Sequence, residues 1–157
     1  MAISPGLSGA ATASGGLALK WLDAISGTTF TGLGATYVQL HNGQPGTDGT
    51  ANVSVVHTLG TIGNRVRPTL SWLGASNNTT TNIATKAITT ILPSWTGWDA
   101  GTDSITHVSV WTGSSSQGAG TFLFSAALTG GAKAVNNGDT LNLTALSLTL
   151  TPTASTT

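Results

Sequence analysis

Hydrophobic and polar residues alternate with a period of two along most of the chain, which is the spacing that β-strands produce. The run YVQLH shows the pattern clearly. Val38 and Leu40 point to one side of the predicted strand, and Tyr37, Gln39 and His41 point to the other. The run leads directly into the stretch NGQPGTDGT, whose Asn-Gly, Pro-Gly and Asp-Gly pairs are turn signals.

The same alternation predicts five further strand regions, and two of them carry an irregularity. The regions are 64–72, 82–93, 103–112, 120–129 and 139–151. Pro68 cannot donate a hydrogen bond to a neighbouring strand, so the first region is expected at a sheet edge or with a local break. In the last region the leucines change parity between Leu143 and Leu146. A β-bulge or a bend near Ala145 would keep both sets in the core.

In two regions the alternation assigns the faces of the strand. In 103–112, Val108 and Val110 share one face, opposite His107, Ser109 and Trp111. In 120–129, four apolar residues are expected on a common face: Phe122, Phe124, Ala126 and Leu128.

One segment before these regions follows a helical period instead. Leu17, Trp21 and Ile25 recur at every fourth position, which places them on one face of a helix over residues 16–26. Gly27 is expected just beyond the C-terminal end of this helix.

Turn signals between the strand regions define the fold class. Roughly seven or eight short strands joined by glycine-rich turns predict a mainly β protein, an antiparallel β-sandwich of jelly-roll type preceded by one short N-terminal α-helix. The length of 157 residues suits one domain. We expect that domain over residues 15–151, with a flexible N-terminal arm over 1–14 and a short C-terminal tail over 152–157.

The chain carries few charged residues. Asp, Glu, Lys and Arg make up 6% of the residues, and five basic residues balance five acidic ones. An ordinary soluble domain contains about 25% charged residues. A net charge near zero favours association over dispersal as monomers. We therefore expect a subunit of a larger assembly, as a homo-oligomer for which a trimer is one candidate state.

Nucleic acid and membrane are disfavoured as partners. Arg65 and Arg67 are the only close basic pair, and the pattern places them as solvated side chains on the outer face of a strand. No apolar run reaches the roughly 18 residues that a membrane helix needs. The N-terminus lacks the pattern of a secretory signal, so we expect synthesis in the host cytoplasm without Sec-type export.

Candidate catalytic and metal-binding residues are sparse. His41, His57 and His107 match no standard ligand spacing, and ordinary strand positions are the favoured interpretation. Asp99 and Asp103 flank a segment with a loose likeness to a calcium loop, which a simple turn explains without an ion. The chain has no cysteine and no nucleophile or phosphate-binding motif. We predict no cofactor, no metal and no enzymatic activity, with a small hydrolase as the least favoured alternative.

Tryptophans offer an alternative to a purely structural role. Trp95 and Trp98 lie in a predicted loop, where their flat faces suit stacking on the rings of a host-surface glycan. The competing interpretation places them in the core or at a subunit interface, where aromatic residues are also enriched. Both interpretations stay open at this point, and the two residues are the candidate glycan or interface contacts.

Three ordered stretches resemble a known family. VQLHNGQPGTDGT (38–50) is similar to a pattern in which a strand of the type Y-V-x-L-H runs into x-G-x-P-G-x-x-G-T. ITHVSVW (105–111) resembles a second strand of that pattern, and FLFSAAL (122–128) followed by KAVNNGDT (133–140) resembles a third motif. The family is that of small tail-fibre-like and minor tail proteins of tailed bacteriophages, and the resemblance covers roughly residues 15–150.

The resemblance implies a structural protein of the virion that makes contacts with copies of itself and with other virion proteins. A minor tail subunit, a tail-fibre-type subunit and a decoration protein on the capsid surface all remain open. The recurrence of the two histidines in the motifs also implies that His41 and His107 lie near each other on adjacent strands and share a structural hydrogen bond.

Overall fold

The structure, a computed structural model, describes residues 27, 34–54, 67–78, 83–89, 93–95, 102–114 and 120–150. The elements in these residues are all β-strands: β1 (Thr36–His41), β2 (Thr69–Leu70), β3 (Ser76–Asn78), β4 (Ile83–Ala87), β5 (Ser94–Trp95), β6 (Asp103–Ile105), β7 (His107–Trp111), β8 (Phe122–Ala127), β9 (Lys133–Val135), β10 (Leu141–Asn142) and β11 (Ser147–Leu150). The predicted N-terminal arm, helix and C-terminal tail lie outside the described residues. Within them, no helix is long and apolar enough to cross a membrane.

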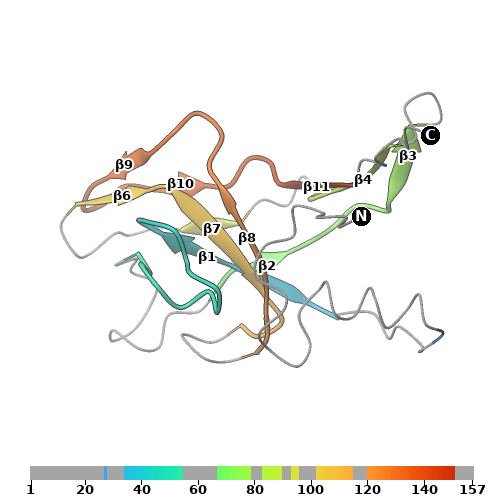
Figure 1. Cartoon of the computed structure of the whole chain (residues 1–157). Helices are drawn as coiled ribbons and strands as arrows, with labels where there is room; N and C mark the ends of the chain where they lie inside the picture. The colour runs from blue at the N-terminus through green and yellow to red at the C-terminus, as the bar shows by residue number, and fades with distance from the viewer. Residues whose placement is uncertain are drawn as a thin grey trace, which may run out of the picture.

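The strands pair antiparallel throughout, which confirms the predicted mainly β, antiparallel class. Their order is β2-β1-β7-β8 in a four-stranded sheet, β11-β4-β3 in a three-stranded sheet, and β10-β5 and β6-β9 in two pairs. Figure 1 shows the four-stranded sheet at the centre, with β6, β9 and β10 on one side of it. The jelly-roll connection between the sheets stays a prediction.

The core joins the four-stranded sheet to the smaller sheets. Val38 and Leu40 of β1 and Val108 and Val110 of β7 lie on one face of the sheet, as predicted, and all four are buried. The remaining core residues come from other strands and connections: Leu70, Ile88, Trp95, Ile105, Leu123, Phe124, Val135, Leu143 and Leu146. Full burial of a side chain of this size contributes about 1.5–3 kcal/mol, so this cluster holds the small sheets in place.

The pairing of β7 with β8 contains a bulge that the sequence pattern does not reveal. Val110 pairs with Phe124, but Trp111 pairs with Phe122, so Leu123 is an extra residue on β8. Leu123 and Phe124 both join the core, whereas the Phe122 ring lies 5.4 Å from the Trp111 ring. The prediction that Phe122 shares a face with Phe124 is therefore wrong.

Two predicted strand regions are each divided between two sheets. Region 139–151 forms β10 and β11, which pair with β5 and β4 respectively. The interruption predicted near Ala145 is confirmed, and Leu143 and Leu146 on either side of it are both buried. Region 103–112 breaks at Thr106 into β6 and β7, which belong to different sheets.

Pro68 directly precedes β2, which is an edge of the four-stranded sheet, as its missing donor predicts. Its carbonyl still accepts a hydrogen bond from Val38 N at 3.0 Å.

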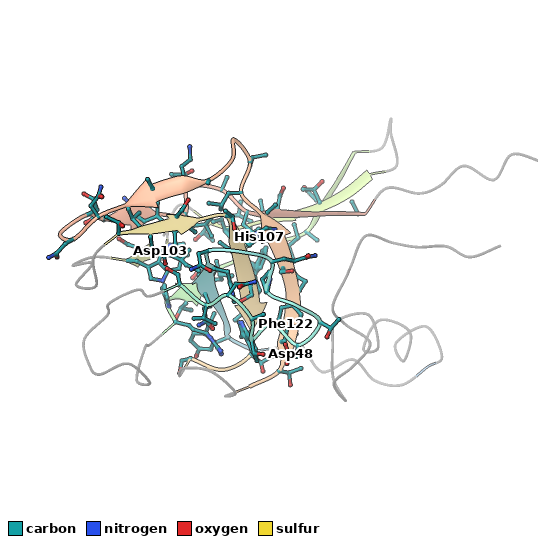
Figure 2. All side chains as sticks on the ribbon, turned by 60° about the vertical axis from the view of Figure 1, so that its left-hand side comes forward. Asp48, Asp103, His107 and Phe122 are labelled. Carbon is teal, nitrogen blue, oxygen red and sulfur yellow. The ribbon has the colours of Figure 1, made fainter. Side chains whose placement is uncertain are left out.

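The three-stranded sheet extends away from the rest of the strands, to the right in Figure 1, and the rotated view of Figure 2 agrees. We call β3, β4 and β11 the projecting sheet. Its base is hydrogen-bonded to the chain that leaves β2: Trp72 bridges to Ile88, and Leu73 N donates to Ala87 O at 2.8 Å. These bonds fix where the projecting sheet begins.

Candidate functional site

The face of β1 and β7 that points away from the core is buried as well. It carries Gln39 and His41 from β1 and Ser109 and Trp111 from β7, and Arg67, just before β2, lies over it. We call these five residues the polar layer. An antiparallel sheet commonly leaves its second face to water, so another part of the chain must cover this one.

The cover is the segment 42–54, here called the cover loop, which contains the NGQPGTDGT stretch. It leaves β1 and returns to the same strand, because Val53 bridges to His41 and Ser54 N donates to Leu40 O at 3.0 Å. Pro45 is fully buried inside it. The turn-rich stretch is thus neither an open loop nor a simple strand end: it is a lid on one sheet face.

The tip of the cover loop packs directly onto aromatic rings. Gly49 has a positive φ of 75°, and a Cβ on it would lie 2.7 Å from Trp111 Cζ2 and also collide with Phe122. Only glycine combines this backbone conformation with such a close approach.

His41 ties the cover loop to the sheet. Its Nδ1 lies 2.9 Å from Ala51 O in the loop, and its Nε2 lies 2.6 Å from Ser109 Oγ. A carbonyl only accepts, so Nδ1 carries the proton. Trp111 Nε1 donates to the same Ser109 Oγ at 2.7 Å, and the Ser109 hydroxyl hydrogen can then point to Nε2. A neutral imidazole with its proton on Nδ1 satisfies every hydrogen bond of this network.

The surroundings of His41 favour the same state. Burial lowers its pKa below the usual 6.5, the hydrogen bond to Ala51 O partly opposes this, and the Arg67 guanidinium and His107 lower it further. His107 pairs directly with His41 across β1 and β7, so their predicted proximity is confirmed. The hydrogen bonds run elsewhere: those of His41 to Ala51 and Ser109, and His107 Nδ1 to Thr106 Oγ1 at 2.9 Å.

Arg67 contradicts the prediction of a solvated side chain. It is 3% exposed, its guanidinium carbon lies 3.9 Å from the centre of the Trp111 ring, and its Nε donates to Gln39 Oε1 at 2.8 Å. Its Nη1 donates to Gly113 O at 3.1 Å. Burial lowers the pKa of Arg67 to about 10, which leaves it charged at neutral pH. The other member of the predicted pair, Arg65, lies outside the described residues.

A second link fixes the end of the cover loop. Ser54 is fully buried, and its hydroxyl donates to the Asp103 carboxylate at the start of β6. Asp103 also accepts from Ser104 N at 2.8 Å. The sequence favoured a simple turn over a calcium loop at Asp103, and in the described part of the chain no cluster of three metal-ligating side chains occurs. Asp99 and His57 lie outside the described residues.

The two candidate tryptophans fall into different categories. Trp95 is 3% exposed and belongs to the core cluster, so in the single chain it takes the core alternative. Trp98 lies outside the described residues. A glycan contact in this region therefore stays a prediction that depends on Trp98.

The fold and the site together define a β-rich structural protein whose buried histidine and serine side chains fasten a loop to the sheet. Ser109 and His41 are both 0% exposed, so the hydroxyl–imidazole pair does not face solvent in the single chain. The family match is consistent with this class. The chain belongs to the family described as podophage GP4 fiber I protein gp80, whose model matches residues 12–151. A search of curated proteins finds no match.

This membership confirms the resemblance to phage proteins of the tail-fibre type. The chain is thus a phage structural protein. The structure also shows which elements the three family-like stretches form. The first supplies β1 and the cover loop, the second supplies β7, and the third supplies β8 and β9.

Sequence reasoning missed the role of Arg67 and the link from Ser54 to Asp103. The signal for Arg67 was present: it is one of only five basic residues and stands between two apolar residues, Val66 and Pro68. In so charge-poor a chain, such a position indicates an internal partner. The Ser54–Asp103 link joins residues 49 positions apart and had no local signal.

Proposed function

We propose that this chain is a non-enzymatic subunit of a phage fibre and that it acts through contacts with copies of itself and with other virion proteins. The family match over residues 12–151 carries the proposal, because it spans nearly the whole chain. The low charge content supports it, since subunits without net charge associate without mutual repulsion. The internal use of His41, Ser109 and Arg67 fits a structural role rather than catalysis.

The proposal favours a fibre-type position over a minor tail or a capsid-decoration position, on the description of the family. We propose that residues 15–151 form the single folded unit and that the N-terminal arm, residues 1–14, attaches it to a neighbouring virion protein. Small, polar and glycine-rich composition suits a segment that becomes ordered on a partner.

Phage particles made with and without this chain test the proposal. Particles produced from a genome that lacks it are expected to contain no fibre density at the corresponding position and to lose infectivity. Supplying the full chain from a plasmid should restore both. Supplying residues 15–157 should give a folded protein that fails to enter the particle. Normal particles in the absence of the chain would refute the fibre role, and full incorporation of the truncated chain would refute the attachment role of residues 1–14.

A further inference from the structure

The projecting sheet stands apart from the other strands (Figure 1), and its central strand β4 is less buried than β1 and β7. Successive residues of a strand point to opposite faces, so the four residues of β4 from Ala84 to Ala87 sample both. All four are half-buried and none is buried. By contrast, β1 and β7 are buried on both of their faces.

The two edges of this sheet are β3 and β11, and in the described part of the chain β4 is the neighbour of each. Among the described residues, no further strand pairs with the outer side of either edge, where the backbone N–H and C=O groups of a strand lie. Rows of such groups are templates for pairing with another strand.

Neither edge carries the features that proteins use to block such pairing, which are charged side chains, proline and bulges. β3 reads Ser-Asn-Asn and β11 reads Ser-Leu-Thr-Leu, and no charged residue occurs in 68–85 or 140–157. The charged residue of the projecting sheet is Lys86 on the central strand, and its Nζ donates to Leu73 O at 3.0 Å. At the same base, Leu73 is 52% exposed, the large hydrophobic residue left most open to solvent among those described.

We infer that the projecting sheet is the surface through which copies of this chain meet, with the β3 edge of one copy paired to the β11 edge of the next. The inference rests on the proposed function and names the contact it requires. A second copy fits because it supplies the matching uncharged edge and because a net charge of zero removes repulsion between copies. Main-chain hydrogen bonds across the junction supply the affinity.

The two edges differ from each other, so the contact is heterologous. Each copy uses one edge and offers the other, and a rotation that closes on itself produces a ring rather than an open filament. A trimer is a ring of this kind. The hydrogen bonds at the base of the projecting sheet fix its direction relative to the body, which is the condition for one defined rotation angle.

Cysteine cross-linking tests the contact, because the natural chain contains no cysteine and any disulfide must join introduced residues. Ser76 in β3 and Ser147 in β11 are both exposed. Protein carrying Ser76→Cys mixed with protein carrying Ser147→Cys is expected to form a disulfide-linked dimer under mild oxidation, whereas each variant alone should not. Cross-linking of Ser76→Cys with itself would replace the heterologous contact by a two-fold one and overturn the inference. No cross-link in the mixture would overturn it as well.

Charged edges provide an independent test. The double variant Ser76→Lys, Ser147→Lys is expected to sediment at the monomer mass of 15.6 kDa, and the unmodified chain is expected to sediment as a multimer. Thr129→Lys, at an exposed turn after β8, is the matched control and should keep the multimer. An unchanged mass for the double variant would refute the inference while leaving the fibre role intact. The fibre role is tested separately, by the loss of fibre density from particles that lack the chain.

Discussion

At the residue scale, His41 carries the most specific constraint in the molecule. It is fully buried, it donates to the cover loop through Nδ1 and it accepts from Ser109 through Nε2. A second proton on the ring would turn Nε2 from an acceptor into a donor, so the Ser109 hydroxyl would have to rotate away from it, and the proton would place a cation near Arg67. One side chain thus makes the attachment of a whole loop depend on a protonation state.

The stability of the folded chain should therefore fall in mild acid. The folded-state pKa of His41 is lowered, so the unfolded chain binds the proton first. The contribution of neutral His41 to the free energy of unfolding is complete above pH 6.5. It is lost as the pH falls through the folded-state pKa of His41. Urea unfolding between about pH 7.5 and about pH 5 should show this decline.

The matched variants separate His41 from its neighbour. His41→Gln removes the titrating ring, so it should be less stable at neutral pH by about 1–3 kcal/mol and should lose this part of the pH dependence. His107→Gln keeps the His41 network and should retain the decline. An equal decline in the His41→Gln variant would show that another group is responsible.

The two candidate tryptophans should respond differently to substitution. Trp95→Ala removes a core side chain and should destabilise the chain by about 3–5 kcal/mol in thermal or urea unfolding. Trp98→Ala is the test of the glycan hypothesis: if Trp98 stacks on a sugar, the variant keeps its stability and loses binding to host-surface polysaccharide. Binding equal to that of the natural chain would end the glycan hypothesis.

At the element scale, the cover loop shows how a segment rich in turn signals becomes part of the packed interior. Its turns are local and follow from Asn-Gly, Pro-Gly and Asp-Gly pairs. Its position on the sheet depends on distant partners, which are Ser109, Trp111 and Phe122. The loop is therefore a structural element with the packing requirements of a strand.

Two glycines in the cover loop form a matched pair for measuring this packing. Gly46 and Gly49 both have positive φ, 78° and 75°. A Cβ at Gly46 would meet Ala51 Cβ at an ordinary 3.5 Å, whereas a Cβ at Gly49 would collide with two aromatic rings. Gly46→Ala should cost about 1 kcal/mol from backbone strain alone, and Gly49→Ala should cost clearly more. Equal costs in urea unfolding would show that the loop tip can lift off the rings.

Prediction from the sequence succeeded where the signal was local. The alternation in YVQLH, the edge position after Pro68 and the break near Ala145 each depend on a few neighbouring residues, and each is confirmed. The predicted face of the Phe122 side chain was wrong. A bulge in the pairing of β7 with β8 shifts the alternation of side chains along β8, and neither strand's sequence alone reveals it. The prediction of a solvated Arg67 side chain was wrong because its burial depends on contacts with Gln39 and Trp111, which are distant in sequence.

At the scale of the whole molecule, charge is nearly absent and hydrogen bonding takes its place. The polar groups that fix the cover loop are the His41 imidazole, hydroxyls, backbone carbonyls and one carboxylate, that of Asp103, while Arg67 is a buried cation in the polar layer. The projecting sheet has uncharged edges. Contacts between copies should then depend on backbone pairing and apolar burial rather than on ion pairs.

Assembly should consequently be insensitive to salt. Exposed ion pairs weaken when the Debye length falls from about 10 Å at 0.1 M to about 3 Å at 1 M ionic strength, whereas strand pairing does not. The multimer mass measured by sedimentation should stay constant over this range. Dissociation at high ionic strength would indicate that some of the ten charged residues, five basic and five acidic, lie at the contact.

The burial of Pro45 and Gly49 in the cover loop also bears on how this protein tolerates change. Surface loops usually accept insertions, but an added residue here would lift the loop from the rings beneath it. The turn between β8 and β9 is different, because residues 129–132 are all exposed and lie between the family-like stretches 122–128 and 133–140. A foreign peptide for display on the phage surface belongs at that turn, and natural variation among related fibres should gather there and spare the cover loop.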